Sequence, residues 1–329
     1  MVSDPRATSG ALNEAQQRVI DELGATMAER PTFADGLAVG LRERINDGLQ
    51  PALALLGDDD SVVISKFMLT QVLSCEPRFL HENSRPFEWS VPVARGTVAH
   101  KAVELSVHWR TTPVAVDLVE ESLSTLSHDG SPISDYLRHL PEAERAQLRS
   151  EAVNATQAFL DGFPPLRTHP HWRPAVEVRS RYELQGNRGV MMGKVDLSLG
   201  SPSGDRSGRV FIDLKTGRRA HSHRDDLRYY ALIETIRYGT PPRMLASYYL
   251  DESRLSTEIV TNAVLWAAAE RVVAATSRLI ELTATTSAEV PAPVYRPSLA
   301  CRWCSLLRTC ETGTRFLDDT HEDEREILP

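Results

Sequence analysis

Apolar positions in the N-terminal third of the chain recur at helical spacing. Residues 12–30 and 33–49 carry apolar side chains three and four positions apart, which predicts two helices. The breaker Gly57-Asp58-Asp59-Asp60 ends this region. After it, Ser65 is suited to cap a helix that ends near Cys75, and a further helix is predicted over residues 96–110.

The middle of the chain changes from helical to alternating patterns. Residues 113–160 show several helical patterns, broken near Gly130 and Pro141, and predict an all-helical insertion. Short β-prone runs follow at 175–184, 189–199 and 209–214, separated by GNRG and GSPSGDRSG. These turn sequences predict two successive hairpins.

The last third predicts a helix, a strand and a second helix. The helix covers residues 223–238, the apolar run 244–250 follows, and a long helix runs from 256 to 283 before the Pro-rich linker EVPAPVYRPS. This order of elements predicts an α/β fold in which a mixed sheet is flanked by helices.

Length and composition set the domain organisation. With 329 residues, of which 41% are hydrophobic, the chain can bury a sizeable core. We expect a helical N-terminal extension at 1–60, a main domain at 61–312 with an insertion at about 112–161 and a cysteine-bearing segment at 295–312, and an acidic tail at 313–329. The sequence has no apolar run of membrane-spanning length and no signal-peptide layout, so a cytoplasmic protein without a membrane partner is expected.

The net charge of -8 is unevenly distributed. Residues 318–326 hold six acids and one arginine, so the rest of the chain carries only -3. Five cations lie between residues 215 and 228: Lys215, Arg218, Arg219, Arg224 and Arg228. This segment is suited to contact the phosphates of a nucleic acid, and a solvated turn and helix face is the alternative interpretation.

Two acids and a lysine on successive β-prone runs point to metal chemistry. Asp213 and Lys215 project from the same strand face, and Asp196 lies among apolar neighbours on the preceding run. Two carboxylates on adjacent strands suit Mg²⁺, which activates water and neutralises charge on a phosphodiester. Lys215 would stabilise the transition state or position the water. Alone, D-x-K is more often a strand-end salt bridge.

Two helices add side chains at four-residue spacing. Gly96 and His100 share one face of the predicted helix 96–110, and Asp226 and Tyr230 share one face of the helix that follows Lys215. A helical histidine is more often structural than a ligand, and Tyr230 alone would be ordinary core.

In order, the elements G-x-x-x-H, G-x-x-D, D-x-K and a helical x-x-x-Y resemble the RecB-like branch of the PD-(D/E)XK nucleases over about residues 61–312. The resemblance implies a restriction-endonuclease-like fold and cleavage of DNA. His100, Asp196 and Asp213 would then bind Mg²⁺ or Mn²⁺, Lys215 would act with the two acids in catalysis, and Tyr230 would support the site. Asp226 stands where the family usually has Gln, which puts a substrate contact or full activity in doubt. Glu177 is an additional acid by analogy, although an exposed strand glutamate is the preferred interpretation.

The cysteines form a second pattern. Cys301, Cys304 and Cys310 have C-x2-C-x5-C spacing, and Cys75 lies in a segment similar to the family's C-P-R-x-F element with Glu76 inserted. Four thiolates bind either Zn²⁺ or an iron-sulfur cluster. The resemblance implies a [4Fe-4S] cluster of structural role, as in CRISPR-associated and AddB-type exonucleases, and we expect Trp303 and Leu306 to pack around it.

Three functions therefore compete. The leading hypothesis is a DNA nuclease of repair, recombination or defence, acting on single-stranded DNA or free ends. The sequence GVMMGK is not a P-loop, so a helicase motor would be a separate partner protein. The alternatives are an inactive nuclease-fold scaffold that binds DNA, and a zinc-stabilised interaction module.

Overall fold

The computed structural model describes residues 12–327 except 27, 167–168, 170–171, 202–206, 221 and 285–290, and only the backbone of 321–327. The centre of the turn sequence after residue 199 and most acidic side chains of the predicted tail lie outside this description. The chain divides into two compact units. The first unit contains Met1–Val39, Trp89–Ser180 and Gly193–Trp266, and the second contains Gly40–Glu88, Arg181–Met192 and Ala267–Pro329.

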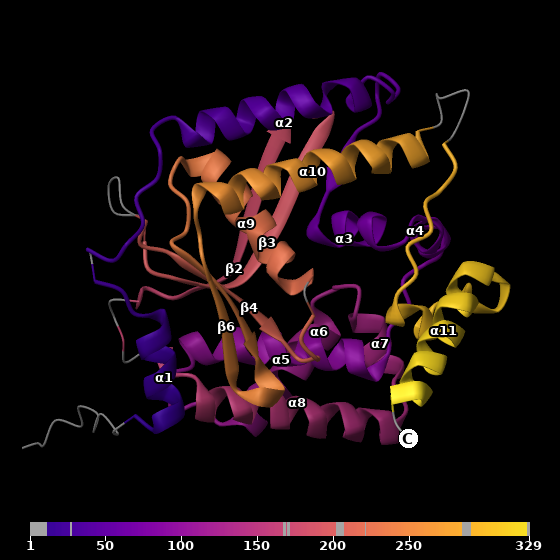
Figure 1. The fold of residues 1–329 in the computed structure, drawn as a ribbon. Coiled ribbons are helices and arrows are strands. Elements are labelled where there is room, and N and C mark those ends of the chain that lie inside the picture. The colour runs from indigo at the N-terminus through magenta and orange to yellow at the C-terminus, as the bar shows by residue number, and fades with distance from the viewer. Residues whose placement is uncertain are drawn as a thin grey trace, which may run out of the picture. The chain divides into compact units, whose positions relative to one another are not determined.

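A mixed sheet forms the centre of the first unit (Figure 1). Strand β3 (Gly189–Leu199) pairs with β2 (Ala175–Leu184) and, antiparallel, with β4 (Val210–Lys215). Strand β5 (Met244–Tyr249) runs parallel to β4, and β6 (Arg254–Ile259) runs antiparallel to β5. The predicted mixed sheet and its first strands are thus confirmed.

Strand β6 corrects the sequence prediction, which began a long helix at residue 256. Ser253 adopts a left-handed backbone conformation with φ 46°, which reverses the chain and lets β6 pair along the whole of β5. Helix α10 (Asn262–Thr283) begins after β6, where the Thr261 hydroxyl accepts a hydrogen bond from the backbone N–H of Val264 at 3.3 Å.

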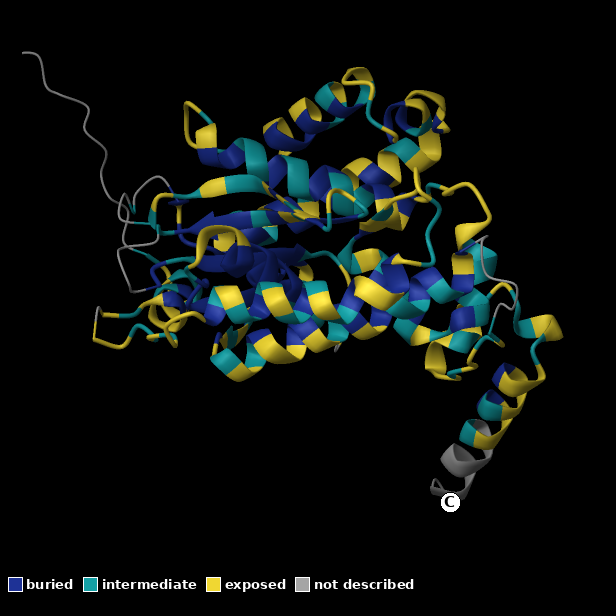
Figure 2. Cartoon of the chain, turned by 90° about the horizontal axis from the view of Figure 1, so that it is seen from above, coloured by how far each residue is buried: buried dark blue, intermediate teal, exposed yellow. Residues whose placement is uncertain are grey.

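Helices cover both faces of this sheet. One face packs against α5 (Val91–His108) and α8 (Glu142–Gly162), with Ala99, Phe159, Ile212 and Tyr248 in a shared core. Helices α6 (Ala115–His128) and α7 (Ser134–His139) pack on α5 and α8, and the helical patterns predicted between residues 113 and 160 are confirmed. Helix α9 (Ser222–Tyr238) lies against the opposite face. The central strands β4 and β5 are almost wholly buried, and Figure 2 shows dark blue strands among the helices.

The first helix of the N-terminal extension is shorter than predicted. Helix α1 (Glu14–Leu23) begins at a capping box formed by Asn13 and Gln16 and ends at Gly24. Val19 and Leu23 join the core of the first unit. This part of the extension therefore caps the core.

The second unit consists mainly of helices. Strand β1 (Val62–Ile64) pairs in parallel with residues 189–191 of β3, and α2 (Leu37–Leu53) lies beside α10, where Arg44 donates two 2.6 Å hydrogen bonds to Glu270. Helix α3 (Lys66–Ser74) starts at Ser65 as predicted. Helix α4 (Glu76–Asn83) follows at once, because Pro77 is tolerated in the first turn of a helix.

Short turns complete the second unit. The 3₁₀ helices η4 (Leu299–Trp303) and η5 (Leu307–Thr309) precede α11 (Glu311–Ile327). Part of the expected acidic tail is thus helical. Among the helices that the structure describes, none combines the length and apolarity needed to cross a bilayer.

Candidate active site

Asp213 and Lys215 form a buried ion pair at the end of β4. Ile212 and Leu214 point into the helical core, so strand alternation directs Asp213 and Lys215 to the other face. The Lys215 ammonium lies 2.6 Å from Asp213 Oδ2 and 3.6 Å from Asp226 Oδ2 on α9. Asp213 is only 2% exposed. Lys215 is therefore held between two carboxylates.

Asp196 and His100 lie beside this pair. Asp196 Oδ2 accepts a 2.8 Å hydrogen bond from the backbone N–H of Leu214, and Asp196 Oδ1 lies 3.5 Å from His100 Nδ1. Burial disfavours the charged imidazole, but the negative charges of Asp196 and Asp213 outweigh it and raise the pKa of His100 above its ordinary value. Elements α5, β3 and β4 thus bring together the four predicted residues His100, Asp196, Asp213 and Lys215.

Two glycines allow this close packing. A Cβ atom at Gly193 would lie 2.7 Å from Tyr230 Cδ1, so the Tyr230 ring packs directly on the strand that carries Asp196. A Cβ atom at Gly96 would lie 3.1 Å from Thr216 Oγ1, just after Lys215. Tyr230 is 5% exposed.

Sequence reasoning missed Arg95. Its guanidinium donates to the backbone carbonyl of Thr216 and to Asp251 Oδ2 at 2.5 Å, which ties α5 to the turn after Lys215. Its position next to Gly96 was the available signal, but an arginine near a helix start has many ordinary explanations.

Two of these four residues, one from α5 and one from β4, open onto a large cavity. A hollow of about 810 Å³ is lined by His100 and Lys215 and also by Glu177, Lys194 and Arg218. Glu177 pairs with Lys194 and has a left-handed φ of 53°, a strained conformation for a glutamate. The interpretation of Glu177 as an ordinary exposed strand residue is therefore wrong: its side chain is 27% exposed and faces this cavity.

The predicted phosphate track is divided by the fold. Arg218 lines the large cavity, whereas Arg219 and Arg224 line a smaller hollow beside β5 and β6. Arg228 donates a 2.8 Å hydrogen bond to Glu258 Oε2 and lies 3.3 Å from Asp225. The charge of Arg228 is thus neutralised, and Asp226 faces Lys215.

The second unit brings the four cysteines to one hollow. Cys75, Cys301, Cys304 and Cys310 are half-buried free thiols that line the same pocket. A Cβ atom at Gly313 would lie 3.4 Å from Cys310 Sγ and 3.5 Å from Cys301 Sγ, so these two sulfur atoms lie close to one point. Backbone N–H groups of Ser298 and Gly313 donate to the sulfurs of Cys301 and Cys310 at 3.4 and 3.3 Å.

Glu76, the inserted residue, anchors this arrangement. It is fully buried, accepts hydrogen bonds from Arg278 at 2.7 and 3.1 Å, and accepts another from the backbone N–H of Val294 at 2.7 Å. Burial disfavours its charge, but these hydrogen bonds hold the pKa of Glu76 below its ordinary value. Arg296 lies 3.2 Å from Glu76 Oε1. Glu76 therefore fixes the segment before Cys301 against α4.

One prediction about the cysteine pocket needs correction. Leu306 lines the cysteine pocket as expected, but Trp303 is 77% exposed, because η4 turns its side chain outward. Across the residues described, no set of three histidine, cysteine or acidic side chains is arranged to hold a metal ion. The side-chain positions therefore support neither the predicted metal site nor the predicted cluster by themselves.

Comparison with known proteins identifies the family. Residues 64–311, three quarters of the chain, match the model of the PD-(D/E)XK nuclease superfamily. One similar solved structure, entitled "Crystal structure of SSO0001", is 12% identical over 84% of this chain and 97% of its own, with a TM-score of 0.32. No curated protein matches. The matched region contains the whole His100, Asp196, Asp213 and Lys215 constellation, and the chain belongs to the PD-(D/E)XK nuclease superfamily.

Proposed function

We propose that this protein is a Mg²⁺- or Mn²⁺-dependent deoxyribonuclease of the RecB-like branch, acting as an exonuclease on single-stranded DNA or free ends. The observation that carries the proposal is the convergence of His100, Asp196, Asp213 and Lys215 beside a cavity of about 810 Å³. Metal-dependent hydrolysis of a phosphodiester uses a metal site and a cation close to the same phosphate, and these four side chains would supply both.

The donor chemistry fits a hard divalent cation. The carboxylates of Asp196 and Asp213 would hold the ion, with His100 as a third ligand, and Mg²⁺ commonly takes one or two carboxylates plus water and phosphate oxygens. When bound, the ion activates water and neutralises charge on the phosphate.

The chain's own residues supply the rest. Leu214 N–H and His100 orient Asp196, and the carboxylates of Asp213 and Asp226 hold the Lys215 side chain in place. The ammonium is thus ready to donate to a phosphate oxygen. Asp226 replaces the family's amide with a second negative charge beside Lys215, and this observation favours the alternative of a weakly active or inactive DNA-binding scaffold.

Cleavage of end-labelled single- and double-stranded DNA tests the proposal. We expect cutting that requires Mg²⁺ or Mn²⁺ and is lost in Lys215→Ala. Lys101→Ala is the matched control, because Lys101 lines the same cavity but pairs with Glu104 at 2.9 Å. DNA binding without cutting by the natural protein would favour the scaffold.

We propose further that the four cysteines hold a [4Fe-4S] cluster of structural role. Support comes from their shared pocket, from the two N–H groups that donate to sulfur, and from the family resemblance, since hydrogen bonds to the sulfurs tune iron-sulfur sites. Anaerobic purification followed by iron, sulfide and zinc analysis separates the alternatives. Zinc without iron would contradict the cluster and favour the zinc-stabilised module, and Cys304→Ala should lose the bound metal and lower thermal stability.

The proposed setting is a cytoplasmic protein of DNA repair, recombination or defence with a separate helicase as partner. Pull-down with DNA ends and a cell extract, using the Lys215→Ala protein to preserve the DNA, would identify such a partner. Recovery of no motor protein in repeated experiments would argue against this part of the proposal.

A further inference from the structure

A smaller hollow lies on the same sheet face as Asp213 and Lys215. It has a volume of about 190 Å³ and lies between β5, β6 and the start of α9. Its volume suits a single anion with a few water molecules, since one water occupies about 30 Å³ in the liquid. We call it the Arg224 pocket, after one of the cations that line it. Its other polar lining residues are Arg219, Ser247, Tyr249, Ser256, Thr257 and Glu258.

Strand register places this pocket next to the candidate active site. Ser247 pairs with Asp213 on one side and with Ser256 on the other, so the three side chains form a row across one face of the sheet. Neighbouring strands are about 4.8 Å apart. Ser247, which lines the Arg224 pocket, therefore lies on the strand next to that of Asp213.

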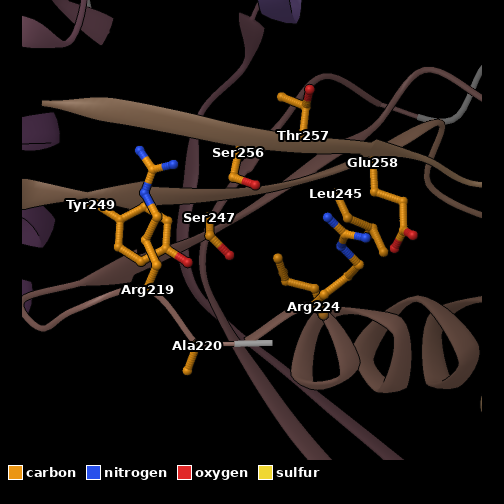
Figure 3. A pocket seen from close by; sticks show the side chains of 10 residues that line it. Arg219, Ala220, Arg224, Leu245, Ser247, Tyr249, Ser256, Thr257 and Glu258 are labelled. Carbon is orange, nitrogen blue, oxygen red and sulfur yellow. The ribbon is translucent and has the colours of Figure 1, made fainter. Parts of the chain in front are cut away.

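A hydrogen-bonded pair of side chains links the wall of the pocket to the wall of the large cavity. His223 lines the large cavity, Tyr249 lines the Arg224 pocket, and His223 Nδ1 lies 3.1 Å from the Tyr249 hydroxyl. Arg219 lies over the Tyr249 ring, with its guanidinium carbon 5.2 Å from the ring centre. Figure 3 shows Arg219 beside Tyr249 at one end, Arg224 near Glu258 at the other, and Ser247 and Ser256 between them.

The polar groups of the pocket suit an anion. Glu258 lines it, but the guanidinium of Arg228 holds this carboxylate through Nε at 2.8 Å. Ser247 is 4% exposed, and within the part of the chain described here no hydrogen bond is found for its hydroxyl and no ion pair for Arg224. A buried hydroxyl and an arginine that face the same small space are the donors that bind phosphate oxygens.

We propose that the Arg224 pocket is a second phosphate-binding subsite, which takes a phosphate of the DNA strand next to the one that is cleaved. This inference rests on the proposed nuclease function. The shared chemistry is a phosphate oxygen anion, which is supplied either by an internal phosphodiester or by a terminal phosphate. Arg224 and Ser247 donate to it, and the strand is thereby held in register with Asp213 and Lys215.

The main test measures binding of short single-stranded DNA without divalent metal. Arg224→Gln should weaken binding about tenfold, the loss of one charge-assisted contact, and reduce the slope of log K against log salt by about 0.7. Ser247→Ala should weaken binding less, at unchanged net charge. Arg237→Gln is the matched control, since Arg237 is an exposed arginine in the last turn of the same helix.

Modified DNA identifies the source of the phosphate. An oligonucleotide series with one neutral methylphosphonate linkage per molecule should contain one position that weakens binding to the natural protein but not to Arg224→Gln. If the ligand is a terminal phosphate, that effect follows removal of the 5′ or 3′ phosphate instead. The subsite would be overturned if Arg224→Gln and Arg237→Gln lost equal DNA affinity. It would also be overturned if Arg224→Gln bound DNA as tightly as the natural protein.

Inorganic phosphate separates this inference from the nuclease proposal. Phosphorus NMR should show that the natural protein binds free phosphate and that Arg224→Gln does not. Phosphate binding through Arg224 in a protein that cuts no DNA would refute the nuclease and keep the anion pocket. Metal-dependent cutting that is unchanged in Arg224→Gln would keep the nuclease and refute the anion pocket.

Discussion

The two candidate sites of this molecule are built on different kinds of backbone. His100, Asp196, Asp213 and Lys215 project from α5, β3 and β4, whose backbone hydrogen bonds fix each side chain before any ligand arrives. The cysteines sit at the ends of helices and 3₁₀ turns: Cys75 lies between α3 and α4, and Cys301, Cys304 and Cys310 lie in or beside η4 and η5. The first site is thus organised by regular structure, and the second depends on side chains that fasten short turns.

The two sites also differ in the partners of their buried charged side chains. In the first, Lys215 lies between two carboxylates at the wall of the large cavity. In the second, the buried charge of Glu76 is fully committed to Arg278, Arg296 and a backbone N–H group. We therefore expect mutation of Lys215 to lower activity above all, and mutation of Glu76 to lower the stability of the fold.

The largest expected effect is on catalysis at Lys215. Lys215→Met should lower the cleavage rate about 10³-fold, since a transition-state donor is removed. It should also lower stability by about 3 kcal/mol, because Asp213 is left buried without its cation. The double variant Asp213→Asn with Lys215→Met should stay inactive but recover most of the stability. Urea unfolding and cleavage assays measure both, and cleavage at the natural rate by Lys215→Met would sink the mechanism.

Glu76→Gln should affect stability and cluster retention instead. Removal of one partner from this buried network should cost about 3 kcal/mol of unfolding free energy. Glu82→Gln on the same helix is the control, because its pair with Arg78 is partly exposed and should contribute less than about 1 kcal/mol. Thermal unfolding and iron content are measured together. Equal behaviour of the two variants would show that Glu76 is not an anchor.

Gly193→Ala tests the packing beneath the first site. The new methyl group would press on the Tyr230 ring, and we expect a loss of about 1–3 kcal/mol together with slower cleavage. Gly217→Ala meets no atom within 4 Å and should be close to neutral in stability. Unfolding curves for the two variants decide the point; a neutral Gly193→Ala would mean that the ring moves aside freely.

Trp303→Ala gives the smallest expected effect. Because this side chain is 77% exposed, its removal should change stability by less than about 0.5 kcal/mol and leave the iron content unchanged. Leu306→Ala, which opens the cysteine pocket, should be more destabilising. A large loss of iron in Trp303→Ala would restore the original prediction that this tryptophan packs around the site.

Several features could be predicted from sequence because they are local. Alternating apolar residues and turn sequences located β2, β3 and β4 within a residue, and Ser65 marked the start of α3. The alternation of strand side chains placed Asp213 and Lys215 on one face. By contrast, β6 was missed, because Arg254–Ile259 contains only two apolar residues and its turn is made by Ser253 with a positive φ in place of the glycine that such turns favour.

Sequence by itself determined which chemical groups are present and their order: the acids, the histidine, the lysine and the cysteine spacing. Tertiary structure decided which of them meet. It set Asp226 against Lys215, separated Arg219 and Arg224 from Arg218, turned Trp303 outward and buried Glu76 between two arginines. The physical reason is that charge pairing and burial depend on distances between residues far apart in the chain, whereas propensity and periodicity report only on near neighbours.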